Sequence, residues 1–298
     1  MNGILLVDKP QGMTSHDVVD ALRKATRIRR IGHTGTLDPR ATGLLILCIG
    51  QATRLSEHFT GLDKTYEGAM RLGIVTSSHD LDGETLEEHP LPEPMTREMI
   101  QDACNAFTGD IQQTPPMVSA VKVGGRRLYK IAREGGDVER QPRPITVHCF
   151  DVTQWEPPDA GIRIECSSGA YVRTLCHDVG KQLGCGAALA QLRRTHIGNY
   201  ALDAATPLDA LDTLDAVRAR LIPMDEALDL PEARVDAARA AIVCSGGAIS
   251  SKALLAPCSV TDGWVQIKDA EGRLLAIASA QPTAMGARLQ PKRVFAGR

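Results

Sequence analysis

The sequence predicts an α+β protein built on a mixed or antiparallel sheet, with a small β-rich module after it. Predicted strands and helices follow one another without the regular strand–helix–strand rhythm of a doubly wound sheet. The pattern changes after Pro223, where short strands are separated by Asp-Gly and Glu-Gly turns at 262–263 and 271–272. We therefore expect one domain over residues 1–225 and a second over residues 229–298.

The N-terminal elements follow from apolar runs bounded by turn residues. Residues 3–7 form a short apolar stretch that predicts a strand ending before a proline. Ser15 is in position to cap a helix that runs to about Thr26, because apolar residues recur on one face. The uninterrupted apolar run 44–49 has the length and composition of a buried strand.

The middle of the chain predicts a strand, a helix and another strand. Residues 65–72 alternate well enough to form a strand. Thr96 is expected to cap a helix whose inward face carries four apolar residues: Met99, Ile100, Ala103 and Phe107. Residues 117–123 are expected to form the next strand.

The remaining elements complete the larger domain and begin the module. Residues 145–153 and 161–167 have strand patterns, and residues 171–183 predict a helix with one apolar face. The acidic stretch 208–220 has a helical pattern. Small residues over 235–243 predict a short helix after the domain boundary.

The formal net charge of −2 over 298 residues argues weakly against a nucleic-acid-binding protein. The charges are segregated, however. Basic residues concentrate over 21–37, 122–143 and 286–298, and acidic residues concentrate over 80–102 and 203–229. Any one cluster could be an ordinary solvated face. Three basic segments together predict a shared surface for a polyanion.

Signals for membranes, metals and common cofactors are missing from the sequence. No apolar run approaches the roughly 20 residues of a membrane span. The chain starts without a basic leader, so we expect a cytoplasmic protein. Its eight cysteines form no C-x-x-C pair, which disfavours a zinc site. Phosphate-loop, dinucleotide-binding and nucleophile-elbow motifs are also absent from the sequence.

One loop carries a candidate for chemistry. The stretch GHTGTLDPRATG at 32–43 places Asp38 among glycines and threonines, just before the predicted buried strand. An Asp in such a loop is ordinarily a turn former or a helix cap. The glycines permit close approach of the backbone to a ligand, and a nearby Arg would keep the carboxyl ionised by lowering its pKa. These residues suggest an active-site loop beside a polyanion surface.

The same loop also carries a resemblance. Together with LLVDKPQGMTS at 5–15, it resembles the paired signature motifs of the TruB family of tRNA pseudouridine synthases. The resemblance continues through KTYEGAMRLG at 64–73, SHDLDGE at 78–84, PPMVSAVKVGGRRLYKIAREG at 115–135, CSSGAYVRTLCHDVGKQLG at 166–184 and LRRTHIG at 192–198. The last 70 or so residues are similar, less closely, to the PUA-type RNA-binding module that often follows this catalytic domain.

The resemblance implies a stand-alone bacterial enzyme that converts the T-loop uridine at tRNA position 55 to pseudouridine. It implies no cofactor and no metal. Asp38 would be the catalytic carboxylate, acting at the sugar C1′, at the base, or by proton abstraction from the sugar. The implied partner is tRNA, held by its T-stem loop. No protein partner or membrane is implied, and nothing demands more than a monomer.

The resemblance also assigns roles to residues around this carboxylate. Tyr66 would lie against the target base, with a core tyrosine as the alternative. Arg173 would pair with the carboxylate, unless it is a surface helix arginine. Tyr171 and Leu192 would line the substrate pocket, although Leu192 also suits core packing. His33 would fill the space that a flipped base vacates, or else bond loop backbone.

Further residues are expected to bind RNA or support the active-site loop: Lys9, Lys64, Lys122, Arg126, Arg127, Arg143, Arg193, Lys292 and Arg293. Lys9 is expected to support the Asp38 loop rather than to perform chemistry. The basic segment at about 115–143 resembles an insertion that clamps the T-stem loop. The C-terminal module would reach toward the acceptor stem.

Two departures from the family pattern stand out. Ala170 stands where a larger residue is common, and Ser77-Ser78-His79 replaces a threonine-rich lead into Asp80. The sequence assigns no role to Asp80.

Other functions share parts of this pattern. One is a pseudouridine synthase that depends on a guide RNA and partner proteins. Another is an RNA-binding or tRNA-folding protein whose catalysis is secondary. A nucleoside hydrolase using Asp38 is a more remote alternative.

Overall fold

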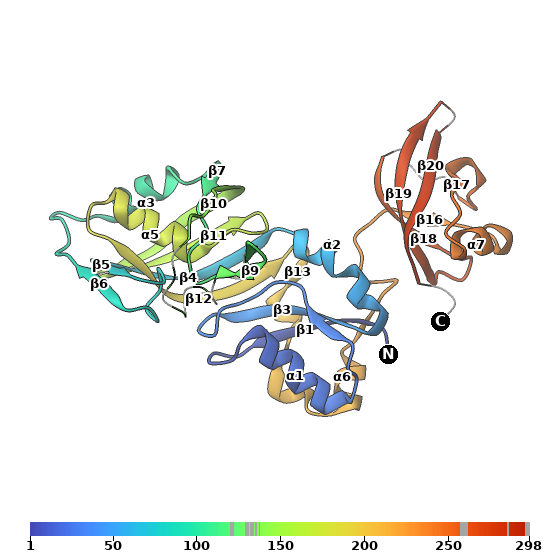
Figure 1. Cartoon of the computed structure of the whole chain (residues 1–298), viewed down its shortest axis with the longest axis horizontal. Helices are drawn as coiled ribbons and strands as arrows, with labels where there is room; N and C mark the ends of the chain where they lie inside the picture. The colour runs from blue at the N-terminus through green and yellow to red at the C-terminus, as the bar shows by residue number, and fades with distance from the viewer. Residues whose placement is uncertain are drawn as a thin grey trace.

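The computed structural model describes residues 1–119, 122–128, 131, 134, 136, 138–256, 262–284 and 286–295. These residues form two units, each built on its own sheet (Figure 1). The larger sheet draws its strands from residues 3–223, and the smaller sheet draws its strands from residues 232–294. The smaller sheet forms a separate lobe toward the C-terminal end of the chain.

The larger sheet has eleven strands within the described residues, and its main path runs β14-β1-β3-β12-β4-β11-β10-β7. Their bounds are Thr206–Pro207 (β14), Gly3–Lys9 (β1), Thr42–Ile49 (β3), Ala187–Ile197 (β12), Lys64–Leu72 (β4), Asp159–Cys166 (β11), Arg143–Glu156 (β10) and Gly109–Gln113 (β7). Short strands β2 (Ile31–His33), β13 (Tyr200–Ala201) and β15 (Ile222–Pro223) join its side. Pairs β1/β14 and β3/β12 are parallel and the other pairs are antiparallel, so the sheet is mixed, as the sequence predicts.

Helices cover both faces of this sheet. Helices α3 (Arg97–Asn105) and α5 (Val172–Gln182) share a core with strands β4, β10, β11 and β12. Helix α1 (Ser15–Thr26) shares a second core with β1 and β3, together with α6 (Leu214–Ala219). Helix α2 (Ser56–Gly61) follows the 3-10 turn η1 (Gly50–Leu55) and contributes to a third core.

The apolar run of β3 is explained by burial on both faces. Leu45, Leu47 and Ile49 enter the core under α1, and alternate residues Leu44 and Ile46 enter the core beside α2. Since successive strand residues point to opposite faces, a strand covered on both sides has no polar face. This double burial makes β3 a rigid support for the Asp38 loop that precedes it.

The C-terminal sheet has the order β16-β18-β19-β20-β17. Its strands are Glu232–Arg234 (β16), Gly263–Lys268 (β18), Leu274–Thr283 (β19), Gly286–Val294 (β20) and Ile249–Ser250 (β17). Helix α7 (Ala237–Cys244) and the 3-10 turn η4 (Ser251–Ala253) complete the unit. It has a core of its own that includes Val235, Val243 and Ile267.

Several contacts tie the two units together. The Arg54 guanidinium donates to the Val294 carbonyl at 2.5 Å and lies 5.3 Å from the centre of the Phe295 ring. Arg293 forms an ion pair with Glu57 at 3.3 Å. The connecting segment is bonded on one side by Tyr200, whose hydroxyl donates to the Ala227 carbonyl at 2.5 Å.

The first helix begins as predicted, but the predicted cap is wrong. Thr14 caps α1, because its hydroxyl accepts from the Asp17 backbone N–H and Asp17 returns a bond to the Thr14 N–H. Ser15 instead bonds both the N–H of Leu37, at 2.8 Å, and the Leu37 carbonyl, at 3.2 Å. The start of α1 therefore anchors the Asp38 loop.

Three other predicted elements differ from the structure. Only Lys122–Val123 (β8) is a strand within the predicted segment 117–123, and residues 120–121 lie outside the described part. The predicted helix over 208–220 is broken into a 3-10 turn, Leu208–Leu211 (η3), and α6. Met99 is 42% exposed, so it does not lie on the inward face of α3 as predicted. Phe107 follows the end of α3 but packs against the same core as Ile100 and Ala103.

The remaining elements are short. Strands β5 (Ile74–Thr76) and β6 (Thr85–Glu88) form a hairpin, and β8 pairs with β9 (Arg126–Arg127) in the basic insertion. A 3-10 turn spans Leu202–Ala204 (η2).

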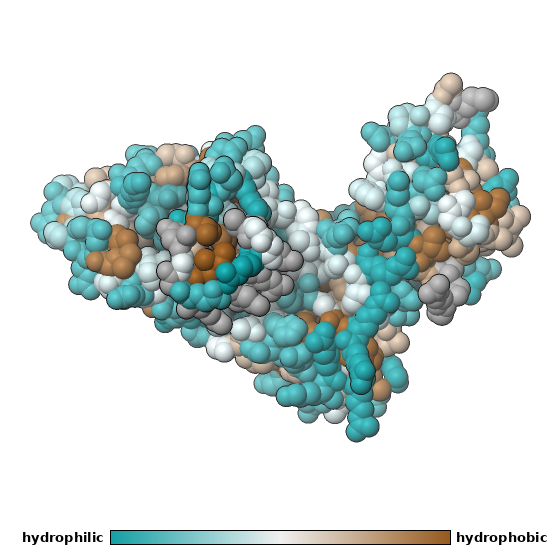
Figure 2. Space-filling view, viewed as in Figure 1, coloured by the Kyte–Doolittle hydropathy of each residue, from teal (hydrophilic) through white to brown (hydrophobic). Residues whose placement is uncertain are grey.

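Across the described residues, no helix is both long and apolar enough to span a bilayer. Figure 2 shows a largely hydrophilic face, with a notch between the two units.

Candidate active site

A cavity of about 270 Å³ opens where the Asp38 loop meets β4, β12 and the start of α5. Its lining includes Asp38 and five other residues that the sequence singled out: Lys64, Tyr66, Tyr171, Arg173 and Leu192. Its volume lies near the lower end of small-molecule sites, which begin at about 300 Å³. One nucleoside is a suitable occupant for a cavity of this size.

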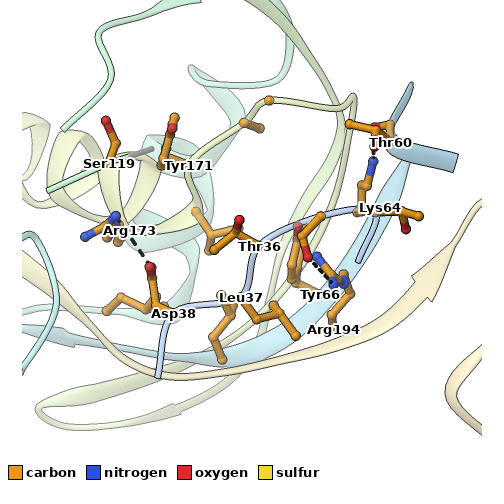
Figure 3. A pocket seen from close by; sticks show the side chains of 17 residues that line it. Thr36, Leu37, Asp38, Thr60, Lys64, Tyr66, Ser119, Tyr171, Arg173 and Arg194 are labelled. Carbon is orange, nitrogen blue, oxygen red and sulfur yellow. Dashed lines mark hydrogen bonds and ion pairs between the residues drawn. The ribbon is translucent and has the colours of Figure 1, made fainter. Parts of the chain in front are cut away.

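Arg173 lies beside Asp38 at one end of the cavity (Figure 3) and also pairs with a second carboxylate, that of Asp80. Its Nη2 lies 3.5 Å from Asp38 Oδ2, and its Nη1 lies 3.6 Å from Asp80 Oδ2. The Arg173 side chain is only 4% exposed, whereas that of Asp38 is 47% exposed. The guanidinium also donates to the carbonyls of Ser78 and Val118. A buried, fixed cation thus holds a carboxylate that remains accessible to a ligand.

The pKa of Asp38 is raised above its ordinary value, chiefly because the surrounding protein removes water from the carboxyl. Arg173 opposes this shift, while the nearby carboxylates of Asp80 and Asp82 add to it. The sequence predicted that a nearby arginine would lower this pKa. Arg173 acts in that direction, but partial burial outweighs it.

Lys9 supports the loop from beneath. Its ammonium is fully buried and donates to the carbonyls of Pro10, Met13 and Pro39 at 2.9, 2.6 and 3.3 Å. Burial lowers the pKa of Lys9 to about 8, and the Asp38 charge opposes that shift. Since Pro39 follows Asp38 directly, the ammonium fixes the backbone that carries the carboxylate.

Tyr66 and Arg194 form the opposite wall of the cavity (Figure 3). Arg194 is 1% exposed, and its guanidinium donates to the carbonyls of Leu44 and Gly35 at 2.8 and 3.2 Å. It also bonds the Tyr66 side chain, and burial raises the pKa of that phenol. Because guanidinium has only donors, the phenol oxygen accepts and its O–H stays available to a ligand.

Tyr171 is held through its backbone. The side-chain amide of Gln113 accepts from the Tyr171 N–H at 2.8 Å and donates to the Tyr171 carbonyl at 3.0 Å. Gln113 is 3% exposed, so this pair of bonds is shielded from water. The Tyr171 ring lies 5.8 Å from the Arg173 guanidinium carbon. The start of α5 is therefore fixed beside the Asp38 loop.

The other predicted residues occupy several positions. His33 ends β2 and is not among the cavity-lining residues. Leu192 both lines the cavity and packs against the main core. Lys64 lines the cavity, and its ammonium donates to the Thr60 carbonyl at 2.6 Å. Burial lowers the pKa of Lys64 to about 8.

Apart from Lys64, the predicted RNA-binding residues are not among the described lining residues of the cavity. Lys122, Arg126 and Arg127 belong to the β8–β9 hairpin, where Arg126 pairs with Glu134 at 2.5 Å. Arg143 is exposed at the start of β10, and Lys292 and Arg293 lie on β20. Arg193 forms an ion pair with Asp8 at 2.7 Å.

Sequence reasoning missed Arg194 and selected its neighbour Arg193. Leu192 lines the cavity, and side chains two positions apart on a strand share a face. Applied to LRRT at 192–195, this rule places Arg194 in the cavity and Arg193 on the opposite face. Ser119 and Gln113 were missed as well, and no local pattern marks either of them.

Comparison with known proteins identifies the family. Residues 23–172 match the TruB family pseudouridylate synthase N-terminal domain, and residues 173–229 match the tRNA pseudouridylate synthase B C-terminal domain. The chain belongs to the TruB family. A TruB relative from Opitutus terrae, named tRNA pseudouridine synthase B, is 52% identical over 229 residues, covering 76% of this chain and 95% of the relative. One of the same name from Burkholderia pseudomallei is 42% identical over 284 residues, covering 94% and 93%.

Solved structures share the TruB fold over nearly the whole chain. A chain from a Cbf5-Nop10-Gar1 complex is 26% identical with a TM-score of 0.75, covering 99% of this chain and 85% of that one. A chain from an H/ACA RNP bound to a substrate RNA containing 2′-deoxyuridine has the same TM-score at 24% identity, which shows the fold alone. Among the described residues, no group of three or more His, Cys, Asp or Glu side chains is arranged to hold a metal.

Proposed function

We propose that this TruB chain is a stand-alone tRNA pseudouridine synthase that isomerises the T-loop uridine at position 55. The observation that carries the proposal is the accessible Asp38 carboxylate, paired with buried Arg173 at a cavity of nucleoside size. The names of the Opitutus and Burkholderia relatives support tRNA as the substrate. In line with what the sequence implies, the proposed enzyme is a cytoplasmic monomer that needs no cofactor.

The proposed reaction is an isomerisation with Asp38 as its catalytic residue. The bond between uracil N1 and the sugar C1′ breaks, the base turns, and C5 forms a new bond to C1′. The C5 proton leaves and N1 gains a proton, so substrate and product have the same composition. The carboxylate acts by one of three routes: attack at C1′, attack at the base, or proton abstraction from the sugar.

Other cavity residues would support this chemistry without supplying the reactive carboxylate. Arg173 would hold Asp38 against the nucleoside and favour its ionised form. Tyr66 would lie against the base and offer its phenolic O–H for proton transfer, with its oxygen held by Arg194. Tyr171 and Leu192 would form the walls that contain the detached uracil.

Access to the uridine requires extrusion from its stack, which costs a few kcal/mol. His33 lies beside the loop but outside the cavity, a position that fits a side chain filling the vacated space. The basic hairpin β8–β9 and the residues of β20 would hold the T-stem loop and the rest of the tRNA by backbone contacts. We assign the C-terminal unit to the PUA-like class because its sequence is similar to that RNA-binding module.

The deciding experiment uses purified chain, an unmodified tRNA transcript, and no added metal or cofactor. Pseudouridine is mapped at single-nucleotide resolution for the native chain, Asp38→Asn and Asp38→Ala. We expect modification confined to the T-loop uridine, and none with either variant. We also expect tRNA affinity to stay within a few-fold of native, because binding is spread over phosphates while chemistry needs this carboxylate.

Each alternative function gives a result that differs from the one expected for the proposed enzyme. A native chain that binds tRNA tightly without modifying it would point to the guide-dependent or RNA-folding functions. Release of free uracil would indicate a hydrolase. Loss of affinity in parallel with loss of rate for Asp38→Asn would contradict the assignment of Asp38 to chemistry.

A further inference from the structure

Two histidine side chains that lie outside the cavity lining stack face to face. The rings of His79 and His177 have centroids 3.9 Å apart and an interplanar angle of 3°. His79 belongs to the loop between β5 and β6, and His177 belongs to α5. His79 Nδ1 also lies 3.4 Å from the hydroxyl of Thr174 on the same helix. One side chain thus contacts two positions of α5 that lie one turn apart and share a face.

The backbone of the His79 loop is attached to the central sheet. The Leu189 N–H of β12 donates to the His79 carbonyl at 2.9 Å, and the Leu81 N–H donates to the Leu189 carbonyl at 3.1 Å. His79 has φ of +67°, a left-handed conformation that histidine adopts more readily than most residues. The loop is therefore fixed to β12 through its backbone and to α5 through its side chains.

The residues adjacent to this stack include two members of the candidate active site. Asp80 follows His79 and forms an ion pair with Arg173, which precedes Thr174. Asp80 is itself held within the loop, since Ser78 donates to its carboxylate at 2.5 Å and the Asp82 N–H donates at 3.1 Å. A shift of this loop relative to α5 would change the position of Asp80 against Arg173, and so that of Arg173 against Asp38.

We propose that the stacked His79–His177 pair is a latch: it holds the His79 loop, which carries Asp80, on α5 and thereby positions Arg173 beside Asp38. This inference rests on the proposed isomerase function. The two histidines are positioning residues, because neither lines the cavity and both act through Arg173.

The surroundings of the latch disfavour protonation of both rings. His79 faces Arg173 and His177 from α5 and Arg140 from the insertion, and it is followed by Asp80. Burial and these cations lower the pKa of His79 to about 4. Burial also lowers the pKa of His177, with Asp178 and Lys181 of its own helix acting in opposite directions. Both shifts therefore favour neutral rings at pH 7.

The test compares single-turnover rate and tRNA affinity for His79→Asn, His177→Asn and His177→Phe. Asn removes the ring and tolerates the left-handed backbone at residue 79. We expect each Asn variant to lose about two- to tenfold in rate, the scale of one aromatic pair, with affinity within twofold of native. The double Asn variant should be no slower than the slower single one, because the residues act as a unit.

A conservative variant and a control separate positioning from general damage. His177→Phe keeps a stacking ring and should restore most of the rate that His177→Asn loses. His89→Asn, at the exposed residue that directly follows strand β6 of the same hairpin, should retain native rate. Proton NMR titration gives an independent readout: His79 should stay neutral to about pH 4 in the native chain, with its pKa rising toward 6.5 in His177→Asn.

The outcomes distinguish this inference from the proposed function. An active native chain whose His177→Asn variant keeps full rate would overturn the latch alone. Failure of His177→Phe to restore the rate, or a loss of affinity equal to the loss of rate, would also overturn it. A native chain that does not modify tRNA would overturn the proposed function and the positioning role with it.

Discussion

The Asp38 carboxyl is subject to two opposing effects. Protein atoms around the loop remove water from it and raise its pKa, while Arg173, with Nη2 at 3.5 Å, stabilises the ionised form. A carboxyl with a raised pKa remains protonated to a higher pH. An activity that needs its ionised form is therefore lost, as pH falls, at a pH above the ordinary aspartate value of 3.8.

Replacing Arg173 with glutamine tests this balance. Arg173→Gln removes the cation that favours the carboxylate, so the pKa of Asp38 should rise further. We expect a lower plateau rate and an acid limb whose midpoint moves to higher pH, measured by single-turnover kinetics at saturating tRNA from pH 4 to 8. Arg193→Gln, on the opposite face of β12, should keep the native midpoint. An unchanged midpoint in Arg173→Gln would contradict this account.

At the residue scale, the side chains that the motifs single out lie together, whereas their electrostatics depend on the fold. Asp38, Tyr66, Tyr171 and Arg173 all line one cavity. The raised pKa of Asp38 was not predictable, because it depends on how much water the folded loop excludes. Lys9 lies where a loop-supporting residue was expected, but its three carbonyl partners depend on the folded turn.

At the scale of elements, close packing of α5 on β12 sets the position of Arg173. A Cβ added to Gly180 of α5 would lie 2.0 Å from the Ala187 N and 2.5 Å from the Ala187 Cβ. Contacts this short with backbone cannot be relieved by a side-chain rotation, so helix or strand must move. The glycine therefore allows the helix to approach the strand that carries Leu192 and Arg194.

Gly180→Ala is expected to destabilise the protein by about 1–3 kcal/mol, the usual range for overpacking. Because the displaced helix carries Arg173, the rate should fall as well. Chemical denaturation monitored by circular dichroism gives the stability, and single-turnover kinetics gives the rate. Gly61→Ala is the matched control, since a Cβ there meets nothing within 4 Å. Equal effects of the two substitutions would reject the close-packing argument.

Elements with a strong local periodicity were predicted from the sequence. Elements whose secondary structure depends on packing against the rest of the fold were missed. The predicted bounds of α1 match the structure, because its apolar stripe and turn residues are local signals. Strand β12 was missed, since LRRTHIG has no clean alternation and its register is interrupted near Leu189 and Arg194. The 208–220 helix breaks because Leu208 and Leu211 are drawn to the core under α1 before α6 begins.

At the scale of the whole molecule, the contacts between the two units were not predictable from sequence. The change of pattern after Pro223 marked a second unit from sequence alone. The bond from Arg54 to the Val294 carbonyl joins side chain and backbone 240 positions apart, and no local pattern reports it. Buried Lys268 adds a bond to the Asp225 carbonyl at 2.7 Å, which fixes the connecting segment on the module side.

Charge distribution, rather than net charge, should govern the response of tRNA binding to salt. The net charge is −2, yet the basic segments 122–143 and 286–298 are candidates to meet the RNA. Each neutralised phosphate releases counterions, and contact with about three phosphates would weaken binding roughly 40-fold between 50 and 200 mM salt.

The charge argument predicts the behaviour of single variants. Lys292→Gln on β20 should reduce the slope of log affinity against log salt by about one unit, measured by filter binding or fluorescence anisotropy. Arg71→Gln serves as the control, because Arg71 pairs with Asp159 at 2.7 Å and its charge is already partnered. A native slope near zero would overturn the polyanion surface. A native slope left unchanged by Lys292→Gln would instead assign the phosphate contacts to the larger unit.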